Sequence, residues 1–233
     1  MKLNRRRVVR SREAAAQQPR NSGRRSVASS LSREDGMKAS RGPIDDKSKG
    51  RSRCVTVWTV GHSTRPVDDF IALLQAQGIR RLVDVRTIPR SRHNPQFNQD
   101  QLAVSLNLAG IEYVHMPPLG GLRHARRDSI NTAWRNASFR GYADYMQTPE
   151  FDAALGELIR LARGRRTAIM CAEAVPWRCH RSLIADALVV RGLQVDEITG
   201  DNRTRPHTLT PWACVAGDRI TYPAAQHKAT PTE

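Results

Sequence analysis

The stretch Thr167–Leu188, TAIMCAEAVPWRCHRSLIADAL, decides the fold predicted for this chain. Its apolar run Ala168–Met170 is short enough for a buried strand, and the chain turns polar directly after it. Pro176 breaks the chain, and from Ser182 onward the apolar residues recur at helical spacing. The stretch therefore predicts a strand, a polar loop and a helix. In an open α/β sheet, ligands bind at this place, beyond the carboxyl end of a strand and beside the next helix.

The same alternation extends on both sides of this stretch. Further strands are predicted at 55–60, 82–85, 111–115 and 195–198, and further helices at 66–78, 99–109 and 142–162, the last broken near Pro149. Strands thus alternate with helices about every 30 residues, which favours βαβ units with right-handed crossovers. The predicted fold class is α/β: a largely parallel sheet of about four to five strands with flanking helices.

The 233-residue chain divides by composition. Residues 1–53 are rich in Arg, Ser, Gly and Lys and cannot bury enough apolar surface to fold, so they are predicted to be a disordered basic tail. Translation from Met37 instead of Met1 is the alternative for this region. Residues 54–222 are predicted to form a single α/β domain, and residues 223–233 a flexible C-terminus.

Charge and cysteine content restrict the class of protein. The net charge is +16; residues 1–53 hold 16 Lys and Arg against 5 Asp and Glu, and the remainder 22 against 17. Such a balance suits a polyanion such as nucleic acid, although a basic tail can also be merely solvated. Four cysteines in a chain of this length do not form a disulfide framework, which predicts a reducing, cytoplasmic location. No apolar run approaches the length of a membrane span.

Chemically active side chains follow four of the predicted strands. If the sheet is parallel, its strand ends share one edge, and that edge receives His62, Ser63, Asp84, Arg86, His115, Cys171 and Glu173. We expect a functional site there, because these residues are not the usual turn formers. His115 can equally be a strand-end histidine without a role.

Cys171 is the predicted nucleophile of this site. It ends a strand, and Arg178, His180, Arg181 and a helix N-terminus would lower its thiol pKa. Glu173, His180 or His62 would then transfer protons, and Asp84 with His62 could act as base and acid. Two structural alternatives stay open: Cys171 can be a buried small apolar residue, and Asp84 can anchor the Arg86 loop through a salt bridge.

Arginine side chains predict an anion-binding site beside the same loop. Arg178 and Arg181 lie at the start of a predicted helix, where backbone N–H groups also favour anions. The predicted loops add Arg86, Arg90, Arg92 and Arg123. Surface salt bridges are the alternative for Arg178 and Arg181. Gly120 and Gly121 allow either a close backbone approach or a turn with positive φ.

A zinc site is the alternative interpretation of the two loop cysteines. Cys171, Cys179 and His180 are acceptable zinc ligands, as is Glu173. However, adjacent Cys and His residues at a helix start are not expected to turn both side chains toward one ion. The sequence requires no cofactor, and zinc remains the alternative.

Six motifs in order resemble one known family: VGHST (60–64), LVDVRTIPRSR (82–92), PQF (95–97), GIEYVHMPPLGG (110–121), RGYADYM (140–146) and MCAEAVPWRCHR (170–181). They are similar to the domain-of-unknown-function 488 family, over roughly residues 55–222. The resemblance implies an α/β fold and, through a label that some members carry, a link to DNA repair. The site that it implies comprises His62, Ser63, Asp84, Arg86, Arg92, Gly120, Gly121, Cys171, Glu173, Cys179, His180 and Arg181.

These observations support three hypotheses. The first is an enzyme that acts on a phosphate-bearing substrate, a nucleotide or nucleic acid, with Cys171, Glu173, His180, His62 and Asp84 as catalytic residues. Its substrate-binding residues would be Ser63, Arg86, Arg92, Gly120, Gly121, Arg178 and Arg181. The second is a non-catalytic nucleic-acid-binding protein, and the third is a metal or redox site on Cys171 and Cys179.

Overall fold

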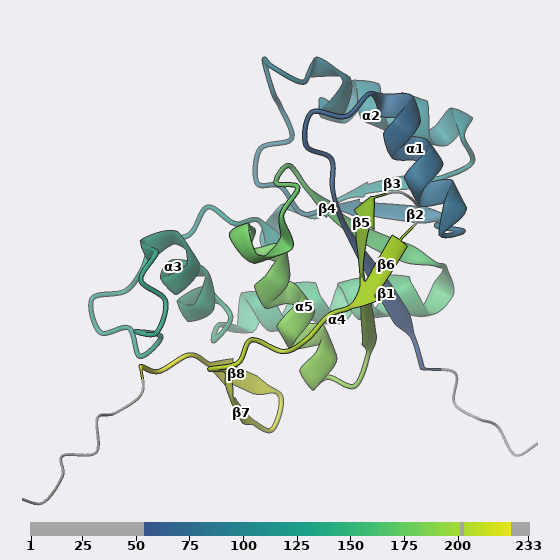
Figure 1. The fold of residues 1–233 in the computed structure, drawn as a ribbon. Helices are drawn as coiled ribbons and strands as arrows, with labels where there is room; N and C mark the ends of the chain where they lie inside the picture. The colour runs from purple at the N-terminus through teal and green to yellow at the C-terminus, as the bar shows by residue number, and fades with distance from the viewer. Residues whose placement is uncertain (1–53, 201–202, 225–233) are drawn as a thin grey trace, which may run out of the picture. The chain divides into compact units, whose positions relative to one another are not determined.

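Six strands form one sheet in the computed structural model, which describes residues 54–200 and 203–224. They are β1 (Thr56–Gly61), β2 (Arg81–Asp84), β3 (Glu112–His115), β4 (Thr167–Cys171), β5 (Gln194–Gly200) and β6 (Arg203–Pro206), in the order β3-β2-β4-β1-β5-β6. The first five are parallel, and β6 is antiparallel to β5 (Figure 1). The predicted α/β class is confirmed. The prediction for residues 1–53 lies outside the described residues, as does the prediction for residues 223–233 from residue 225 onward.

The sixth strand and a short hairpin were not expected. Every residue of β6 is exposed, so its sequence RTRP carries no apolar alternation by which a strand is recognised. Strands β7 (Cys214–Ala216) and β8 (Arg219–Thr221) form a separate two-stranded hairpin. Edge strands of this kind are held by their neighbours and by backbone hydrogen bonds, which a single-residue pattern does not reveal.

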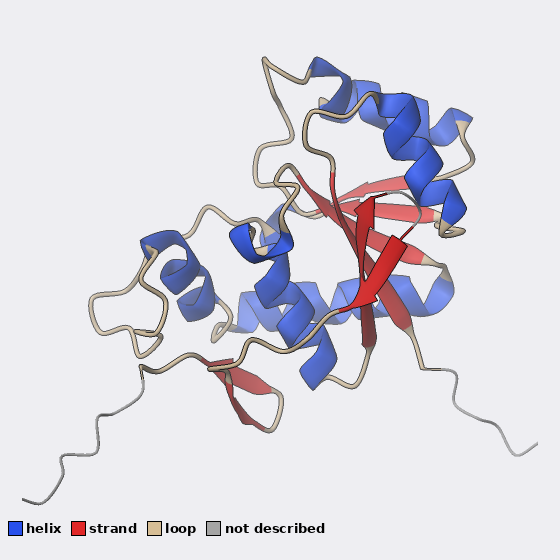
Figure 2. Ribbon diagram, in the orientation of Figure 1, coloured by secondary structure: helices blue, strands red, loops and turns tan. Residues whose placement is uncertain are grey.

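The described residues form five α-helices: α1 (Val67–Ala76), α2 (Gln99–Leu108), α3 (Ala137–Tyr145), α4 (Pro149–Gly164) and α5 (Arg181–Val190). Helices α1 and α2 pack on one face, and α4 and α5 on the other (Figures 1 and 2). The predicted break near Pro149 separates α3 from α4. No helix in the described part of the chain is both long and apolar enough to cross a membrane.

Alternation along the buried strands divides the core into two layers. Val57 and Ile169 belong to the layer beneath α4 and α5, whereas their neighbours Trp58 and Ala168 belong to the layer beneath α1 and α2. Successive strand side chains point to opposite faces, so one apolar strand contributes to both layers. The registers pair Gly61 with Cys171 and β2 with both β3 and β4, which brings the carboxyl ends of four strands to one edge.

A buried ion cluster attaches the C-terminal segment to α5 and β5. His207 donates from Nε2 to Asp186 (2.9 Å) and from Nδ1 to Glu197 (2.8 Å), so both ring nitrogens carry hydrogen. Tyr222 donates its hydroxyl to Asp186 over 2.8 Å. Burial would lower the pKa of His207, but its hydrogen bonds to Asp186 and Glu197 outweigh burial and raise the pKa to about 9.

The stability of this attachment depends on pH. Because the folded pKa of His207 lies above its usual 6.5, its stabilising effect is complete below about pH 6.5 and lost as pH rises through about 9. We expect the urea midpoint of unfolding to fall more between about pH 7 and about pH 10 in the unmodified protein than in His207→Gln. His124→Gln, at an exposed histidine, is the matched control and should keep the unmodified pH dependence. Parallel curves for His207→Gln and the unmodified protein would contradict the assignment.

Candidate functional site

The carboxyl edge of the sheet holds the side chains that strand ends deliver. His62 and Ser63 follow β1, Asp84 ends β2, Arg86 comes shortly after it, and Cys171 ends β4. The strand-end loops are joined by backbone hydrogen bonds from His62 to Cys171 (3.0 Å) and from Ser63 to Ala172 (2.9 Å). The edge therefore forms as parallel pairing predicts, and the contacts of each residue separate supporting groups from groups open to a ligand.

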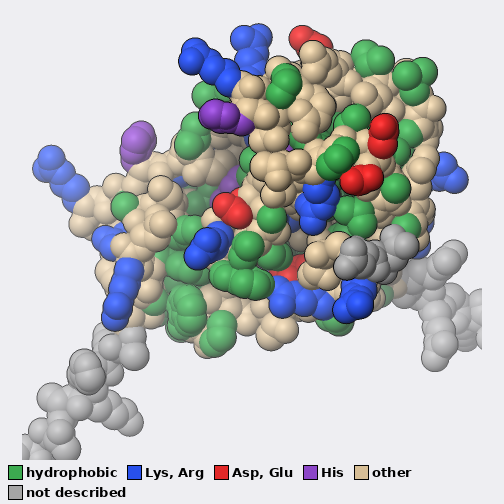
Figure 3. Space-filling model, turned by 45° about the horizontal axis from the view of Figure 1, so that its top comes forward, with side chains coloured by type: hydrophobic (Ala, Val, Ile, Leu, Met, Phe, Trp, Pro, Cys, Tyr) green, Lys and Arg blue, Asp and Glu red, His purple; other side chains and the backbone are tan. Residues whose placement is uncertain are grey.

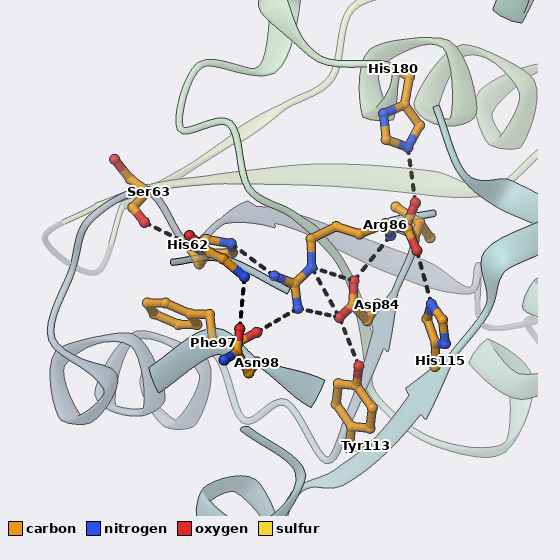
Figure 4. A network of polar contacts seen from close by, with 11 residues as sticks. His62, Ser63, Asp84, Arg86, Phe97, Asn98, Tyr113, His115 and His180 are labelled. Atoms are coloured by element: carbon orange, nitrogen blue, oxygen red, sulfur yellow. Dashed lines mark hydrogen bonds and ion pairs between the residues drawn. The ribbon is translucent and has the colours of Figure 1, made fainter. Parts of the chain in front are cut away.

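Asp84 and Arg86 form a buried ion pair. Arg86 donates from Nε to Oδ1 of Asp84 over 2.9 Å and from Nη2 to Oδ2 over 2.5 Å. The hydroxyl of Tyr113 donates to the same carboxylate over 2.7 Å, and Nη2 of Arg86 also donates to the carbonyl oxygen of Phe97 over 2.8 Å (Figure 4). Asp84 is wholly buried and Arg86 is 6% exposed. These contacts favour the structural alternative for Asp84, in which it anchors the Arg86 loop, because both charges are neutralised within the protein.

His62 is held as a neutral imidazole beside this pair. Its Nδ1 lies 2.7 Å from the carbonyl oxygen of Ser63, which only accepts, so Nδ1 carries the hydrogen. Its Nε2 then accepts from Nη1 of Arg86 over 3.2 Å, and its ring stacks on Phe97. Burial lowers the pKa of His62 to about 4, with the Arg86 charge acting in the same direction. Both nitrogens are engaged, which favours a supporting role over proton transfer.

Cys171, Cys179 and His180 form a second cluster at the same edge. Nδ1 of His180 lies 3.9 Å from the sulfur of Cys171 and 3.7 Å from that of Cys179, and the three ligand atoms all lie within 4.8 Å of one another. The expectation that adjacent Cys179 and His180 would diverge was wrong. Cys179 has an extended backbone (φ −129°, ψ 142°) and His180 a helical one (φ −56°, ψ −15°), and this change directs both side chains to one point.

The two thiols of this cluster differ in acidity. A hydrogen bond from the Cys171 thiol lowers the pKa of Cys179 well below its usual value, helped by His180 and the Arg181 charge against the effect of burial. The same hydrogen bond, together with burial, raises the pKa of Cys171. Of the two thiols, Cys179 is therefore the one that ionises more readily. The sequence pattern predicted the lowered pKa for Cys171 and not for Cys179. A contact between two cysteines eight positions apart cannot be seen in a sequence.

A pocket of about 650 Å³ opens over this edge. Ten residues predicted from the sequence line it: His62, Ser63, Arg86, Arg90, Gly121, Cys171, Glu173, Arg178, Cys179 and His180. Six others do not: Asp84, Arg92, His115, Gly120, Arg123 and Arg181. Six further lining residues were not predicted, because none of them directly follows a strand: Thr87, Ser91, Asn94 and Leu122 in loops, and Ser138 and Phe139 in α3. Figure 3 shows Lys and Arg side chains spread over the face in view and not gathered in one patch.

Arg181 is buried beneath the pocket and not presented to it. It is 1% exposed, and it donates to the carbonyl oxygen of Glu173 over 2.7 Å and to the hydroxyl of Thr59 over 3.4 Å. Its Nε has no hydrogen-bond partner among the described residues. The side chain thus fastens the loop after β4, and its charge favours the thiolate of Cys179. A direct role in binding a ligand would require it to leave these contacts.

Gly120 and Gly121 allow other residues to approach the backbone closely. Of the two roles predicted for them, this one and not a turn with positive φ fits the structure. A Cβ at Gly121 would lie 2.5 Å from Nδ1 of His180, and one at Gly120 would overlap the Thr87 hydroxyl. Neither glycine has positive φ. Any side chain at position 121 would therefore fill the space beside the imidazole.

One family matches this chain. The family described as "Domain of unknown function DUF488" matches residues 66–188, more than half of the 233 residues and all but the first of the strand ends that form the pocket. No curated protein and no solved structure matches the chain. The motifs from Leu82 to Arg181 lie within the matched residues. The chain therefore belongs to the DUF488 family of domains of unknown function.

Proposed function

We propose that this protein is an enzyme that binds a phosphate-bearing substrate, a nucleotide or nucleic acid, in the pocket at the sheet edge. The observation that carries the proposal is the composition of the pocket wall. A thiol–thiol–imidazole cluster lies on it together with two arginines, Arg90 and Arg178, whose side chains make no hydrogen bond or ion pair with another described residue. Reactive groups and available cations on one concave surface are typical of an active site.

The binding half of the proposal rests on those two arginines. Arg86 and Arg181 are occupied by Asp84 and by the loop after β4, so they are not available to a ligand. Arg90 and Arg178 are both exposed and line the pocket, Arg90 from the loop after β2 and Arg178 from the loop after β4. Guanidinium groups bind phosphate with two parallel, charge-assisted hydrogen bonds. The hydroxyl of Ser63 and the amide of Asn94 line the same pocket and offer further donors.

The chemical half rests on the cluster. The thiolate of Cys179 is a nucleophile or a metal ligand, and the imidazole of His180 is positioned by the carbonyl oxygen of Val85. Glu173 lines the same pocket and is exposed, so its carboxylate can take a proton from a reacting group. Direct attack by the thiolate and activation of water by a bound metal would both use these side chains.

Removing one pocket arginine is expected to weaken phosphate binding. We expect Arg178→Ala to lower the affinity for a nucleoside monophosphate about tenfold, because a hydrogen bond to a charged group is worth about 1.5–3 kcal/mol. Isothermal titration calorimetry of the full chain, reduced and without added metal, measures this affinity. Arg90→Ala should act in the same direction.

Arg92→Ala is the matched control for this experiment. Arg92 lies in the same loop as Arg90 but does not line the pocket, so its removal changes the net charge equally without removing a pocket contact. An equal loss in all three variants would show charge attraction alone and overturn the pocket proposal.

In a panel of phosphate esters, nucleotides and short oligonucleotides, Cys179→Ser should abolish turnover and retain binding. Unchanged turnover would exclude the cluster from catalysis.

Non-catalytic binding of nucleic acid is the second candidate function. The observation that favours it is the net charge of +16, most of which resides in residues 1–53, outside the described residues. Affinity of this kind falls steeply with salt and depends little on any one arginine. Oligonucleotide binding that is insensitive to Arg90→Ala and Arg178→Ala, but lost at high salt, would favour this candidate over the enzyme.

A further inference from the structure

We propose that Cys171, Cys179 and His180 bind a zinc ion whose fourth coordination position faces the pocket. The site goes beyond the proposed function, because binding of the ion does not require a phosphate-bearing ligand. In residues 54–200 and 203–224, these three form the one group of at least three Cys, His, Asp or Glu ligand atoms close enough to share an ion. Two sulfurs and one imidazole nitrogen favour zinc over magnesium or calcium, which prefer oxygen ligands.

The spacing of the ligand atoms fits tetrahedral zinc. With Zn–S bonds of about 2.3 Å and a Zn–N bond of about 2.0 Å, two ligand atoms of a tetrahedral site lie about 3.5–3.8 Å apart. The two sulfur-to-nitrogen distances here are 3.7 and 3.9 Å. The ion therefore requires movements of only a few tenths of an ångström along these two edges. Cys171 and Cys179 are both free thiols, so neither sulfur is used in a disulfide.

The hydrogen bonding of His180 leaves Nδ1, the nitrogen that faces the two sulfurs, free to bind the ion. Its Nε2 lies 3.2 Å from the carbonyl oxygen of Val85, and a carbonyl only accepts, so Nε2 carries the hydrogen (Figure 4). In the neutral ring Nδ1 then carries a lone pair, which can bind an ion placed between it and the two sulfurs. Metal-binding histidines commonly donate their second N–H to a backbone carbonyl in this way, which orients the ring.

The surroundings provide room and balance charge. Gly121 passes beside Nδ1 of His180, where any Cβ would lie 2.5 Å from that nitrogen. Arg181 is buried beneath the same loop, where it donates to the carbonyl oxygen of Glu173, and it adds a positive charge beneath the site. Binding forms two Zn–S bonds and one Zn–N bond, releases the remaining thiol protons to solvent and transfers no electrons. Affinity should therefore rise with pH until both thiols are ionised.

Three protein ligands leave one position open. All three residues line the pocket, so the open position faces it. Sites with three protein ligands and one open position activate a water molecule, whose pKa falls to about 7. Glu173 lines the same pocket, and its carboxylate is the proposed acceptor for the proton of that water. This use of the open position rests on the proposed function, whereas the presence of the ion does not.

Metal content is measured without any substrate. We expect the reduced full chain to bind one zinc ion per chain, determined by inductively coupled plasma mass spectrometry and by competition with a chromogenic chelator. Cys171→Ser, Cys179→Ser and His180→Ala should each weaken zinc binding by more than about 100-fold, because loss of a group that only orients a ligand already costs about 10- to 100-fold. Cys54→Ser and Cys214→Ser, at exposed cysteines, are the matched controls and should retain one ion.

Cobalt substitution keeps the test decisive if a variant fails to fold. Co²⁺ bound to the unmodified chain should show thiolate-to-metal charge-transfer absorption and the visible bands of a tetrahedral ion. Absence of these bands, or equal zinc binding by the site variants and the controls, would overturn the proposal. So would a Cys171–Cys179 disulfide found by mass spectrometry in protein purified without reductant and unable to bind zinc after reduction. Loss of phosphate binding with zinc binding intact would refute only the proposed function.

Discussion

Asp84→Ala is expected to lower the free energy of unfolding by about 3–5 kcal/mol, because it leaves the buried guanidinium of Arg86 without its counter-ion. The carboxylate accepts three hydrogen bonds from the Arg86 guanidinium, one from the Arg86 backbone N–H and one from Tyr113, and it is wholly buried. Urea unfolding monitored by circular dichroism measures the change. The loop after β2 should loosen with it, because the Arg86 guanidinium also donates to the carbonyl oxygen of Phe97, and the Arg86 backbone carbonyl oxygen accepts from Nε2 of His115.

Two further variants separate the buried charge from general damage. Asp128→Ala removes one partner of the exposed pair between Arg126 and Asp128, and it should leave the urea midpoint unchanged. Asp84→Leu combined with Arg86→Met removes both buried charges and should unfold at higher urea than Asp84→Ala alone. If Asp84→Ala were as stable as Asp128→Ala, the buried ion pair would not have the stabilising effect assigned to it. If Asp84→Ala does not fold, the milder Asp84→Asn, which keeps the shape and one acceptor oxygen, takes its place.

Gly61→Ala is expected to destabilise the fold by about 3 kcal/mol or more and to distort the site, because the new Cβ meets backbone that cannot move alone. That Cβ would overlap the carbonyl oxygen of Glu173 and lie 2.7 Å from its carbonyl carbon. The same carbonyl oxygen accepts from Arg181, and β1 pairs with β4 up to Cys171. Relief of the clash must therefore displace the loop that follows Cys171. The urea midpoint and zinc affinity should both fall.

Gly156→Ala is the matched control. Gly156 lies in α4 and is exposed, and a Cβ added there would meet no atom within 4 Å beyond its own helix backbone and chain neighbours. Alanine at this position should stabilise the helix by about 0.5–1 kcal/mol, since glycine is the more flexible residue in a helix. Equal stability of Gly61→Ala and the unmodified chain would mean that the backbone at the sheet edge yields more easily than its hydrogen bonds imply.

Much of the fold follows from local pattern. Apolar runs such as Ala168–Met170 are strands because they are buried on both faces, and Thr148 and Pro149 begin α4 because proline suits a first helical turn. The edge strand β6 escaped prediction because its exposed residues have no such pattern. Local sequence therefore describes the buried strands and the helices better than it describes strands held only by a neighbour.

The sequence by itself determined that strands and helices alternate, and parallel strands must end at one edge, so it also determined which residues gather there. Only the tertiary structure decided what each of them does. Asp84 and His62 are engaged by Arg86, the pKa of Cys179 is lowered, and His180 is oriented by Val85, a residue 95 positions away. The physical reason is that periodicity encodes the direction of a side chain relative to its own strand or helix. Hydrogen bonds and pKa values depend instead on atoms that packing brings close from distant parts of the chain.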